Sequence, residues 1–144
     1  MGGKLGTALV SICLCVCLCA GLCVGLGGFL ASGAQAASSL DRQLAKLGPD
    51  ERAQQACVIK GLPKIAADKK LPGADSIETG ALSSAVVAGT KVTVKGGAIR
   101  AKHKWYKLSF DCTVTSDQMK ATAFTYSIGA EIPEAQWEKV GLWP

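Results

Sequence analysis

The stretch KHKWYKLSFDCTV, residues 102–114, decides how this chain folds. Its apolar residues alternate with polar ones, and this strict alternation predicts a half-buried antiparallel β-strand. After a turn at residues 116–118, the stretch 121–128 returns with its own apolar residues on the same side. The two stretches therefore predict a hairpin, which we place at the centre of a sheet. Its buried face is expected to hold Tyr106, Leu108, Phe110, Cys112, Val114, Phe124, Tyr126 and Ile128.

Two helices are predicted before the sheet. Residues 38–48 place Leu40, Leu44 and Leu47 on one helical face, with Ser39 as the capping residue. Pro49 suits the first position of a second helix, which we expect to end at Gly61 or near Pro63. A polar connection follows at 64–80, with a turn at Pro72 and Gly73.

From residue 81 the residue pattern changes from a helical spacing to an alternation of every second residue, which predicts short strands at 84–88, 90–95 and 98–100. The C-terminal stretch 131–144 reads as a short helix that begins at Pro133 and ends at Gly141. The fold class is therefore α+β: N-terminal helices and a short C-terminal helix packed on a small antiparallel sheet with a central hairpin.

The N-terminus predicts export. Met1 to Lys4 carries one positive charge, residues 5–30 contain no charged residue, and Ala34 and Ala36 fit the small positions before a signal peptidase site. We therefore expect a signal peptide at 1–36 and a mature domain at 37–144, located in the periplasm or secreted. The alternative is an uncleaved inner-membrane anchor through residues 5–30, since about 20 apolar residues span a bilayer.

Cysteine usage predicts one disulfide bond. The chain has 7 cysteines, and all of them lie in the uncharged N-terminal run except Cys57 and Cys112. A pair of cysteines in an oxidising compartment indicates a disulfide, which would stabilise the domain by about 4 kcal/mol in the chain-entropy model. A metal site is the alternative, but no further cysteine or second histidine remains to complete its ligands.

Three phrases together resemble the bacterial domain of unknown function 930 family: WYKLSFDC at 105–112, FTYSIG at 124–129 and IPEAQWEKVGLW at 132–143. The resemblance covers roughly residues 40–143 and is weakest between 61 and 88. It implies a small exported protein without an assigned activity. It supports the extent of the domain and the disulfide, and it supplies no catalytic residues. The long, cysteine-rich export signal is not a feature of that resemblance.

The sequence contains little that suggests catalysis. The only histidine, His103, stands between Lys102 and Lys104, and neighbouring positive charge disfavours the imidazolium form. Nucleophile-elbow, phosphate-loop and zinc-protease motifs are absent, so no cofactor or metal is expected. A hydrolase centred on His103 and Asp111 is the least favoured hypothesis.

Positive charge gathers in one window of the sequence. No acid occurs between Glu78 and Asp111, and if the strands are adjacent their outer positions make one basic face with an exposed tryptophan. Such a face suits an anionic envelope polymer or lipid phosphate, and nucleic acid is not expected outside the cell. The alternative is that these lysines only prevent sheet aggregation. The candidate face comprises Lys91, Lys95, Arg100, Lys102, His103, Lys104, Trp105 and Lys107.

Trp137 and Trp143 near the C-terminus suggest a second surface. Large aromatic side chains near a terminus usually dock on their own domain, and the alternative is a tail that binds an unknown protein partner or acts as an inhibitor. The first hypothesis is thus a non-enzymatic exported binding or structural module that uses the basic face. The second is a partner module that uses Trp137 and Trp143.

Overall fold

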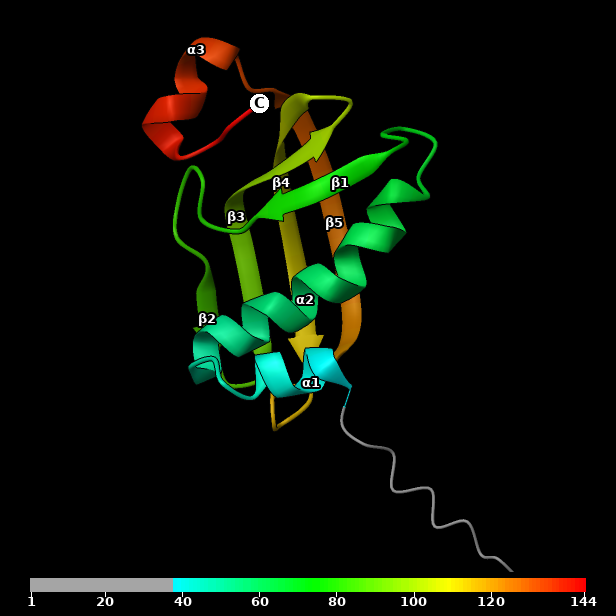
Figure 1. The fold of residues 1–144 in the computed structure, drawn as a ribbon, viewed down its shortest axis with the longest axis vertical. Coiled ribbons are helices and arrows are strands. Elements are labelled where there is room, and N and C mark those ends of the chain that lie inside the picture. The colour runs from blue at the N-terminus through cyan, green and yellow to red at the C-terminus, as the bar shows by residue number, and fades with distance from the viewer. Residues whose placement is uncertain (1–37) are drawn as a thin grey trace, which may run out of the picture. The chain divides into compact units, whose positions relative to one another are not determined.

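The computed structural model describes residues 38–144, and the predicted export segment at 1–36 lies outside them. Figure 1 shows a long helix across one face of an antiparallel sheet and a short helical segment at one end of the sheet. The α+β fold class is confirmed. The elements are α1 (Ser39–Leu44), α2 (Pro49–Ala66), β1 (Ala74–Glu78), β2 (Val86–Ala88), β3 (Lys91–Ala101), β4 (Lys104–Val114), β5 (Ala121–Glu131), α3 (Glu134–Trp137) and the 3₁₀ turn η1 (Glu138–Val140).

The sheet has five antiparallel strands in the order β1-β3-β4-β5, and β2 also pairs with β3. β1 pairs with the end of β3 near Ala101, whereas β2 pairs with its beginning near Lys91. The predicted β4–β5 hairpin is present, but β5 lies at the edge of the sheet. The central hairpin is β3–β4, because β3 continues the sheet on its other side.

The inner face of the sheet forms the main core beneath α2. The alternation predicted for β4 is confirmed: Leu108, Phe110, Cys112 and Val114 are buried in this core, and Tyr106 packs against it. β5 adds Phe124, with Tyr126 and Ile128 partly buried beside it. The period-two pattern of the sequence thus identified the inner face of both strands.

Helix α2 packs closely on the sheet because its inner side carries small residues. Ala53, Ala56, Cys57 and Gly61 are buried there, and a Cβ atom on Gly61 would lie 2.6 Å from Cε2 of Phe124. The helix does not end near Pro63, as predicted, but continues to Ala66. Proline removes one backbone hydrogen bond from a helix, and the burial of the following turn against the sheet maintains the helix beyond it.

Two polar contacts fix the C-terminal end of α2 to β5. Lys64 Nζ donates a hydrogen bond to the carbonyl oxygen of Phe124 at 2.8 Å, and the Tyr126 hydroxyl donates to Asp68 Oδ2 at 2.7 Å. The backbone N–H of Lys70 and the Tyr126 hydroxyl hold the pKa of Asp68 below its usual value. The same hydrogen bond to Asp68 raises the pKa of Tyr126.

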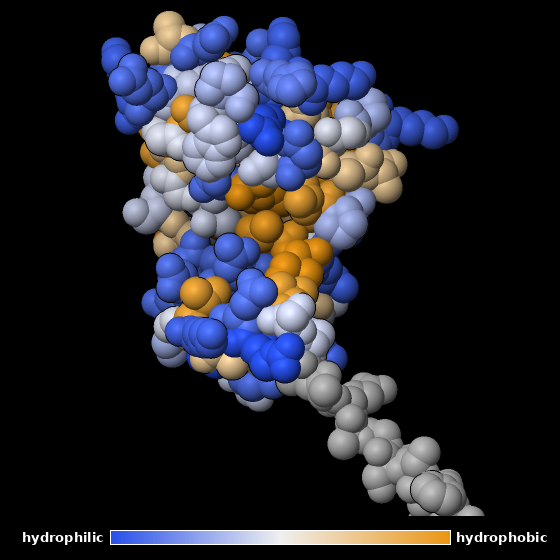
Figure 2. Space-filling model, in the orientation of Figure 1, coloured by the Kyte–Doolittle hydropathy of each residue, from blue (hydrophilic) through white to orange (hydrophobic). Residues whose placement is uncertain are grey.

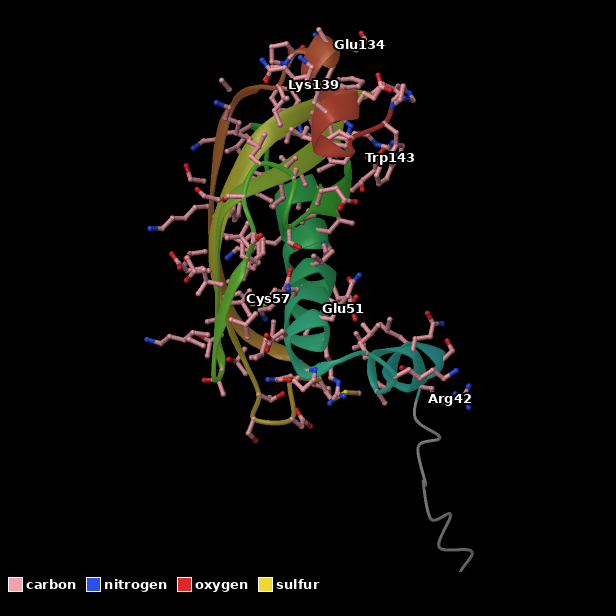
Figure 3. The ribbon with its side chains drawn as sticks, turned by 90° about the vertical axis from the view of Figure 1, so that its left-hand side faces the viewer. Arg42, Glu51, Cys57, Glu134, Lys139 and Trp143 are labelled. Carbon is pink, nitrogen blue, oxygen red and sulfur yellow. A yellow bond between two sulfur atoms is a disulfide. The ribbon has the colours of Figure 1, made fainter. Side chains whose placement is uncertain are left out.

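A disulfide joins the two layers of the domain. Cys57 on α2 and Cys112 on β4 are bonded, with their Cα atoms 6.1 Å apart, which lies within the usual range for a disulfide. The predicted pairing is confirmed, and it ties the N-terminal helices to the central strand. Figure 3 shows Cys57 between α2 and the sheet.

The three short strands predicted at 84–100 are rearranged in the structure. β2 is shorter than predicted, and the other two are one strand, β3, with a register shift between Val94 and Gly97. The shift falls at two glycines, and the carbonyl oxygen of Gly96 accepts hydrogen bonds from the N–H groups of Leu82 and Ser83. The connection predicted at 64–80 also contains a strand, β1, that sequence reasoning missed.

Helix α1 is shorter than predicted and is capped by Ser38 rather than Ser39. Ser38 Oγ accepts from the Asp41 N–H at 3.0 Å, and the Asp41 carboxylate accepts from the Ser38 N–H. The helix ends at Leu44, and the Arg52 guanidinium donates hydrogen bonds to the carbonyl oxygens of Leu44 and Leu47. Leu44 is buried, whereas Leu40 remains exposed.

A second, smaller core lies on the outer face of the sheet, where the C-terminal segment returns. Its buried residues are Ala98, Trp105, Ile132, Trp137 and Leu142. The indole N–H of Trp105 donates to the Trp143 carbonyl oxygen at 2.7 Å, and that of Trp137 donates to the Ile132 carbonyl oxygen at 2.8 Å. The C-terminal segment therefore docks on its own domain. Gly141 ends the 3₁₀ turn η1 in the left-handed conformation, with φ of 70°.

Candidate functional site

The part of the outer face that the C-terminal segment leaves uncovered is the candidate site, here called the open face. It consists of the side chains that alternate with the core residues of β3, β4 and β5. The strand register places them in rows: Thr93 lies opposite Asp111, which lies opposite Thr125, and the next row holds Lys91, Thr113 and Ala123. The full set is Lys91, Thr93, Lys95, Lys107, Ser109, Asp111, Thr113, Ala123, Thr125 and Ser127.

The open face contains two adjoining shallow depressions. One has a volume of about 330 Å³ and includes Lys95, Ser109 and Ser127 in its lining. The other has a volume of about 280 Å³ and includes Lys91, Thr113 and Ala123. Thr93, Asp111 and Thr125 line both of them. The two depressions therefore form one trough across three strands, and the outward side chains along it are largely polar.

Hydrogen bonds within the trough hold its central aspartate. Thr93 Oγ1 donates to Asp111 Oδ1 at 2.8 Å, and Thr125 Oγ1 donates to the backbone oxygen of Asp111 at 3.5 Å. Asp111 keeps its second carboxylate oxygen free of hydrogen bonds to residues 38–144. The trough therefore offers hydroxyl groups that donate or accept and one carboxylate oxygen that accepts.

Three lysines of the candidate basic face, Lys91, Lys95 and Lys107, stand on the open face and are exposed. Within the described residues none of the three forms an ion pair, because the two salt bridges there involve other cations. Figure 3 shows side chains that end in nitrogen projecting from the sheet on the side opposite α2. These ammonium groups are available to a ligand.

Two further cations of the predicted face are paired with acids. Arg100 Nε contacts Asp75 Oδ1 at 2.9 Å, and its guanidinium also stacks over the Trp105 ring. Lys104 Nζ contacts Glu131 at 3.1 Å, and that hydrogen-bonded carboxylate raises the pKa of Lys104. Both cations are already neutralised by the fold, so they contribute less positive potential than the sequence suggested.

The remaining members of the predicted face lie elsewhere. Lys102 and His103 form the two-residue turn between β3 and β4, with φ of 51° and 61°. The prediction that Trp105 is exposed among the charges is wrong: its exposed fraction is 0%. Trp105 does point to the outer side of the sheet, as its position in the strand requires, but the C-terminal segment covers it. The single predicted face is thus divided.

The structure does not bring His103 and Asp111 together. His103 precedes the first residue of β4, and Asp111 lies near the far end of this strand of 11 residues. At about 3.3 Å of rise per residue, the two side chains are roughly 25 Å apart. A catalytic pair needs hydrogen-bond distance between its members, so the hydrolase hypothesis for these residues is wrong.

The candidate partner tail is also divided. Trp137 is buried in the small core, with 6% of its surface exposed, and it cannot contact a partner without undocking. Trp143 keeps 49% of its surface exposed and stands edge-on to Trp105, with ring centroids 5.9 Å apart.

Residues 38–144 contain no cluster of three or more histidine, cysteine, aspartate or glutamate side chains arranged to hold a metal ion. Among the helices in that range, none combines the length and apolar character that crossing a bilayer requires.

Sequence reasoning missed the hydroxyl groups of the open face. Thr93, Ser109, Thr113, Thr125 and Ser127 all occupy outward positions of strands, and that alternation was visible in the sequence. Their convergence was not visible, because it depends on the register between strands. The hydroxyls change the chemistry of the site from a purely cationic surface to a mixed one.

Comparison with known proteins agrees with the resemblance found in the sequence. No curated protein and no solved structure matches the chain. One family model does match, described as Domain of Unknown Function (DUF930), and its match spans residues 44–142. That span includes both cysteines of the disulfide, every strand of the sheet and the C-terminal segment as far as Leu142. The chain therefore belongs to the domain of unknown function 930 family.

Proposed function

We propose that this domain is a non-enzymatic binding module that holds an anionic, hydroxyl-bearing polymer on the open face of its sheet. The observation that carries the proposal is the set of three unpaired ammonium groups, Lys91, Lys95 and Lys107, around a trough lined with hydroxyls. Ammonium groups attract phosphate or carboxylate groups, and the hydroxyls can exchange hydrogen bonds with sugar hydroxyls.

The arrangement of charges favours a ligand whose anionic groups are spaced apart. Lys91 and Lys95 are separated by roughly 13 Å along β3, at about 3.3 Å per residue. Between them, the Asp111 carboxylate stands across from Thr93 and would repel an anionic group. A uronic acid polymer or a sugar–phosphate polymer fits this pattern, because a hydroxyl of the ligand can donate to Asp111 while its charges contact the lysines.

The test measures binding of alginate, polyphosphate and neutral dextran by calorimetry at several salt concentrations. We expect alginate to bind, with an affinity that falls as salt rises, and dextran not to bind. Lys95→Ala should weaken binding roughly threefold to tenfold and reduce the salt dependence by about one ion. Lys46→Ala, an exposed lysine on the other side of the domain, is the matched control and should change nothing.

Asp111→Asn separates the spaced-charge ligand from a simple polyanion. The substitution removes the repulsion of anionic groups, and it replaces a carboxylate acceptor by a weaker amide acceptor. Polyphosphate has no hydroxyl to donate along its chain, so its binding should strengthen, whereas alginate that donates a hydroxyl to Asp111 should gain less or lose affinity. Binding of alginate that is insensitive to both Lys95→Ala and Asp111→Asn would refute the site.

Lipid phosphate is the other ligand that the basic face suits. Vesicles of phosphatidylglycerol and phosphatidylcholine provide the comparison with the soluble polymers. An alternative outcome is that the domain binds these vesicles and not alginate, and that binding is lost when Lys91, Lys95 and Lys107 are substituted. That result would show that the ligand is a membrane surface and not a polymer.

We also propose that the domain acts outside the reducing cytosol. The uncharged N-terminal run, the small residues at Ala34 and Ala36 and the disulfide all support export, since disulfides persist in oxidising compartments. The intact mass of protein purified from its native compartment tests this proposal. A mass that corresponds to residues 37–144 with one disulfide is expected. The full-length mass would favour an anchor at residues 5–30, and two free thiols would contradict export.

A protein-partner role rests on the exposed half of Trp143. Aromatic contacts at an interface respond little to salt, in contrast to the polymer binding proposed above. Partner capture that is lost with Trp143→Ala and unchanged by salt would favour this second function.

A further inference from the structure

The three free lysines of the open face lie in a line along the strands. Lys91 is paired with Thr113 of β4, and Lys107 stands nearer the start of the same strand. The part of β4 from 107 to 113 is roughly 20 Å long at about 3.3 Å of rise per residue. Lys95 lies between the two ends on β3, in the lining of the larger depression. An anionic polymer that contacts all three lysines therefore runs along the strands and not across them.

The C-terminal segment covers the outer face of the sheet immediately beside Lys107. Ala98 is the partner of Lys107 in the register of β3 and β4, and its exposed fraction is 0%. Ala98 lies in the small core, where Trp137 and Leu142 of the C-terminal segment pack with it. Figure 1 shows α3 and the C-terminus at the end of the sheet where β4 begins. The segment therefore forms a wall at one end of the line of lysines.

The exposed charge on this wall is mainly acidic. Glu134 and Glu138 are exposed, and the salt bridges among residues 38–144 involve neither of them. Lys139 stands in the same turn as Glu138, so α3 and η1 together carry more negative than positive charge. Figure 2 shows hydrophilic side chains over this end of the molecule, and Figure 3 shows Glu134 and Lys139 on its surface. Acidic groups repel an anionic chain, so the wall opposes such a chain by charge as well as by contact.

The opposite end of the line presents cationic and small side chains. Lys91 is the first residue of β3 and is exposed, and the depression beside it reaches Ala123 on the edge strand β5. A polymer can leave the domain past Lys91, whereas at Lys107 it meets the wall. The open face is therefore asymmetric along the direction in which the polymer would lie.

We infer that the open face binds the end of the anionic polymer, as a terminal stretch of about four sugar rings, which matches the distance of roughly 20 Å from Lys91 to Lys107. The inference rests on the proposed function and adds the length and the position of the bound stretch. A chain end stops at the wall and keeps all three lysine contacts. An internal stretch would have to bend away from the sheet at Lys107, and it would lose that contact.

Calorimetry with alginate oligomers of increasing length, from the disaccharide to the octasaccharide, and with long alginate tests the inference. The affinity per chain should rise up to the tetrasaccharide and then stay constant, with one domain bound per chain at every length. Several domains on each long chain, or an affinity per chain that keeps rising beyond the tetrasaccharide, would overturn the inference and leave the proposed function standing. Absence of binding at every length would refute the proposed function itself.

Reversal of the charge on the wall gives a second test. The double variant Glu134→Lys, Glu138→Lys should bind the octasaccharide roughly threefold to tenfold more tightly than the tetrasaccharide, with a salt dependence greater by about two ions. Glu51→Lys is the matched control, because Figure 3 shows Glu51 on the side of α2 that faces away from the sheet. This control should bind both oligomers equally, as the wild-type chain does. All three substituted residues are exposed, so the melting temperature should not change. Equal binding of both oligomers by the double variant, or the same preference in Glu51→Lys, would contradict the acidic wall.

Discussion

Reduction of the Cys57–Cys112 bond should remove a large part of the stability of the domain. The bond closes a loop of 55 residues. In the chain-entropy model, a loop of that length lowers the free energy of folding by about 4 kcal/mol, chiefly by restricting the unfolded chain. Small domains are stable by only about 5–15 kcal/mol. The reduced protein should therefore remain folded near room temperature with little margin.

The assay is urea unfolding followed by tryptophan fluorescence, with and without reductant. Both sulfur atoms are buried, so the bond must be reduced in urea and the protein refolded with reductant present. With a urea dependence of about 1–3 kcal/mol per molar, the midpoint should fall by roughly 2 M. The Cys57→Ala, Cys112→Ala double variant should be somewhat less stable than the reduced protein, because it also leaves a cavity.

A loss of less than about 1 kcal/mol on reduction would refute this reasoning. It would mean that the unfolded chain already keeps α2 near β4, or that the core holds the two layers together without the bond. In either case the disulfide would not be the feature that stabilises this small domain.

Three other results are expected. Gly61→Ala should destabilise the domain by about 1–3 kcal/mol in urea unfolding, because the added methyl group overlaps the Phe124 ring and outweighs the gain in helix propensity. Trp105→Ala should cost about 3–5 kcal/mol and expose the C-terminal segment to protease, since Trp105 is fully buried beneath that segment. Tyr126→Phe should lower stability at neutral pH. Since the folded-state pKa of Asp68 is lowered from 3.8, this difference should persist above that pH and shrink as the pH falls through the lowered value in acid titrations of unfolding.

The sequence predicted the parts of the fold that depend on local pattern. The alternation in β4 identified its inner face, Pro49 marked the start of α2, and Gly141 marked the end of the helical turn η1. β1 escaped prediction because its five residues carry a weak pattern and form a strand through pairing with the end of β3. The length of α2 beyond Pro63 likewise depends on tertiary packing.

The candidate site was predictable only as a group of charges. The alternation of side chains along β4 correctly placed Trp105 on the outer side of the sheet with Lys107. The burial of Trp105, however, depends on the C-terminal segment, which returns to cover it. Which cations remain free also depends on tertiary structure, since Asp75 and Glu131 reach Arg100 and Lys104 from other strands. The sequence gives the order of the charged residues along the chain. It does not give the register between strands or the ion pairs, and both are needed to define the site.

The disulfide supports the open face from the other side of the sheet. Cys57 lies on the inner side of α2, and Cys112 lies on the inner side of β4, whose outer side carries Asp111 and the trough. The bond therefore fixes the strand that places Asp111 between Thr93 and Thr125 to the helical layer. Because the rows of the trough depend on the register of β4 with its two neighbours, the same bond that stabilises the domain also holds these side chains in fixed positions. A fixed row of hydroxyls and charges across three strands favours binding of an extended polymer over capture of small molecules.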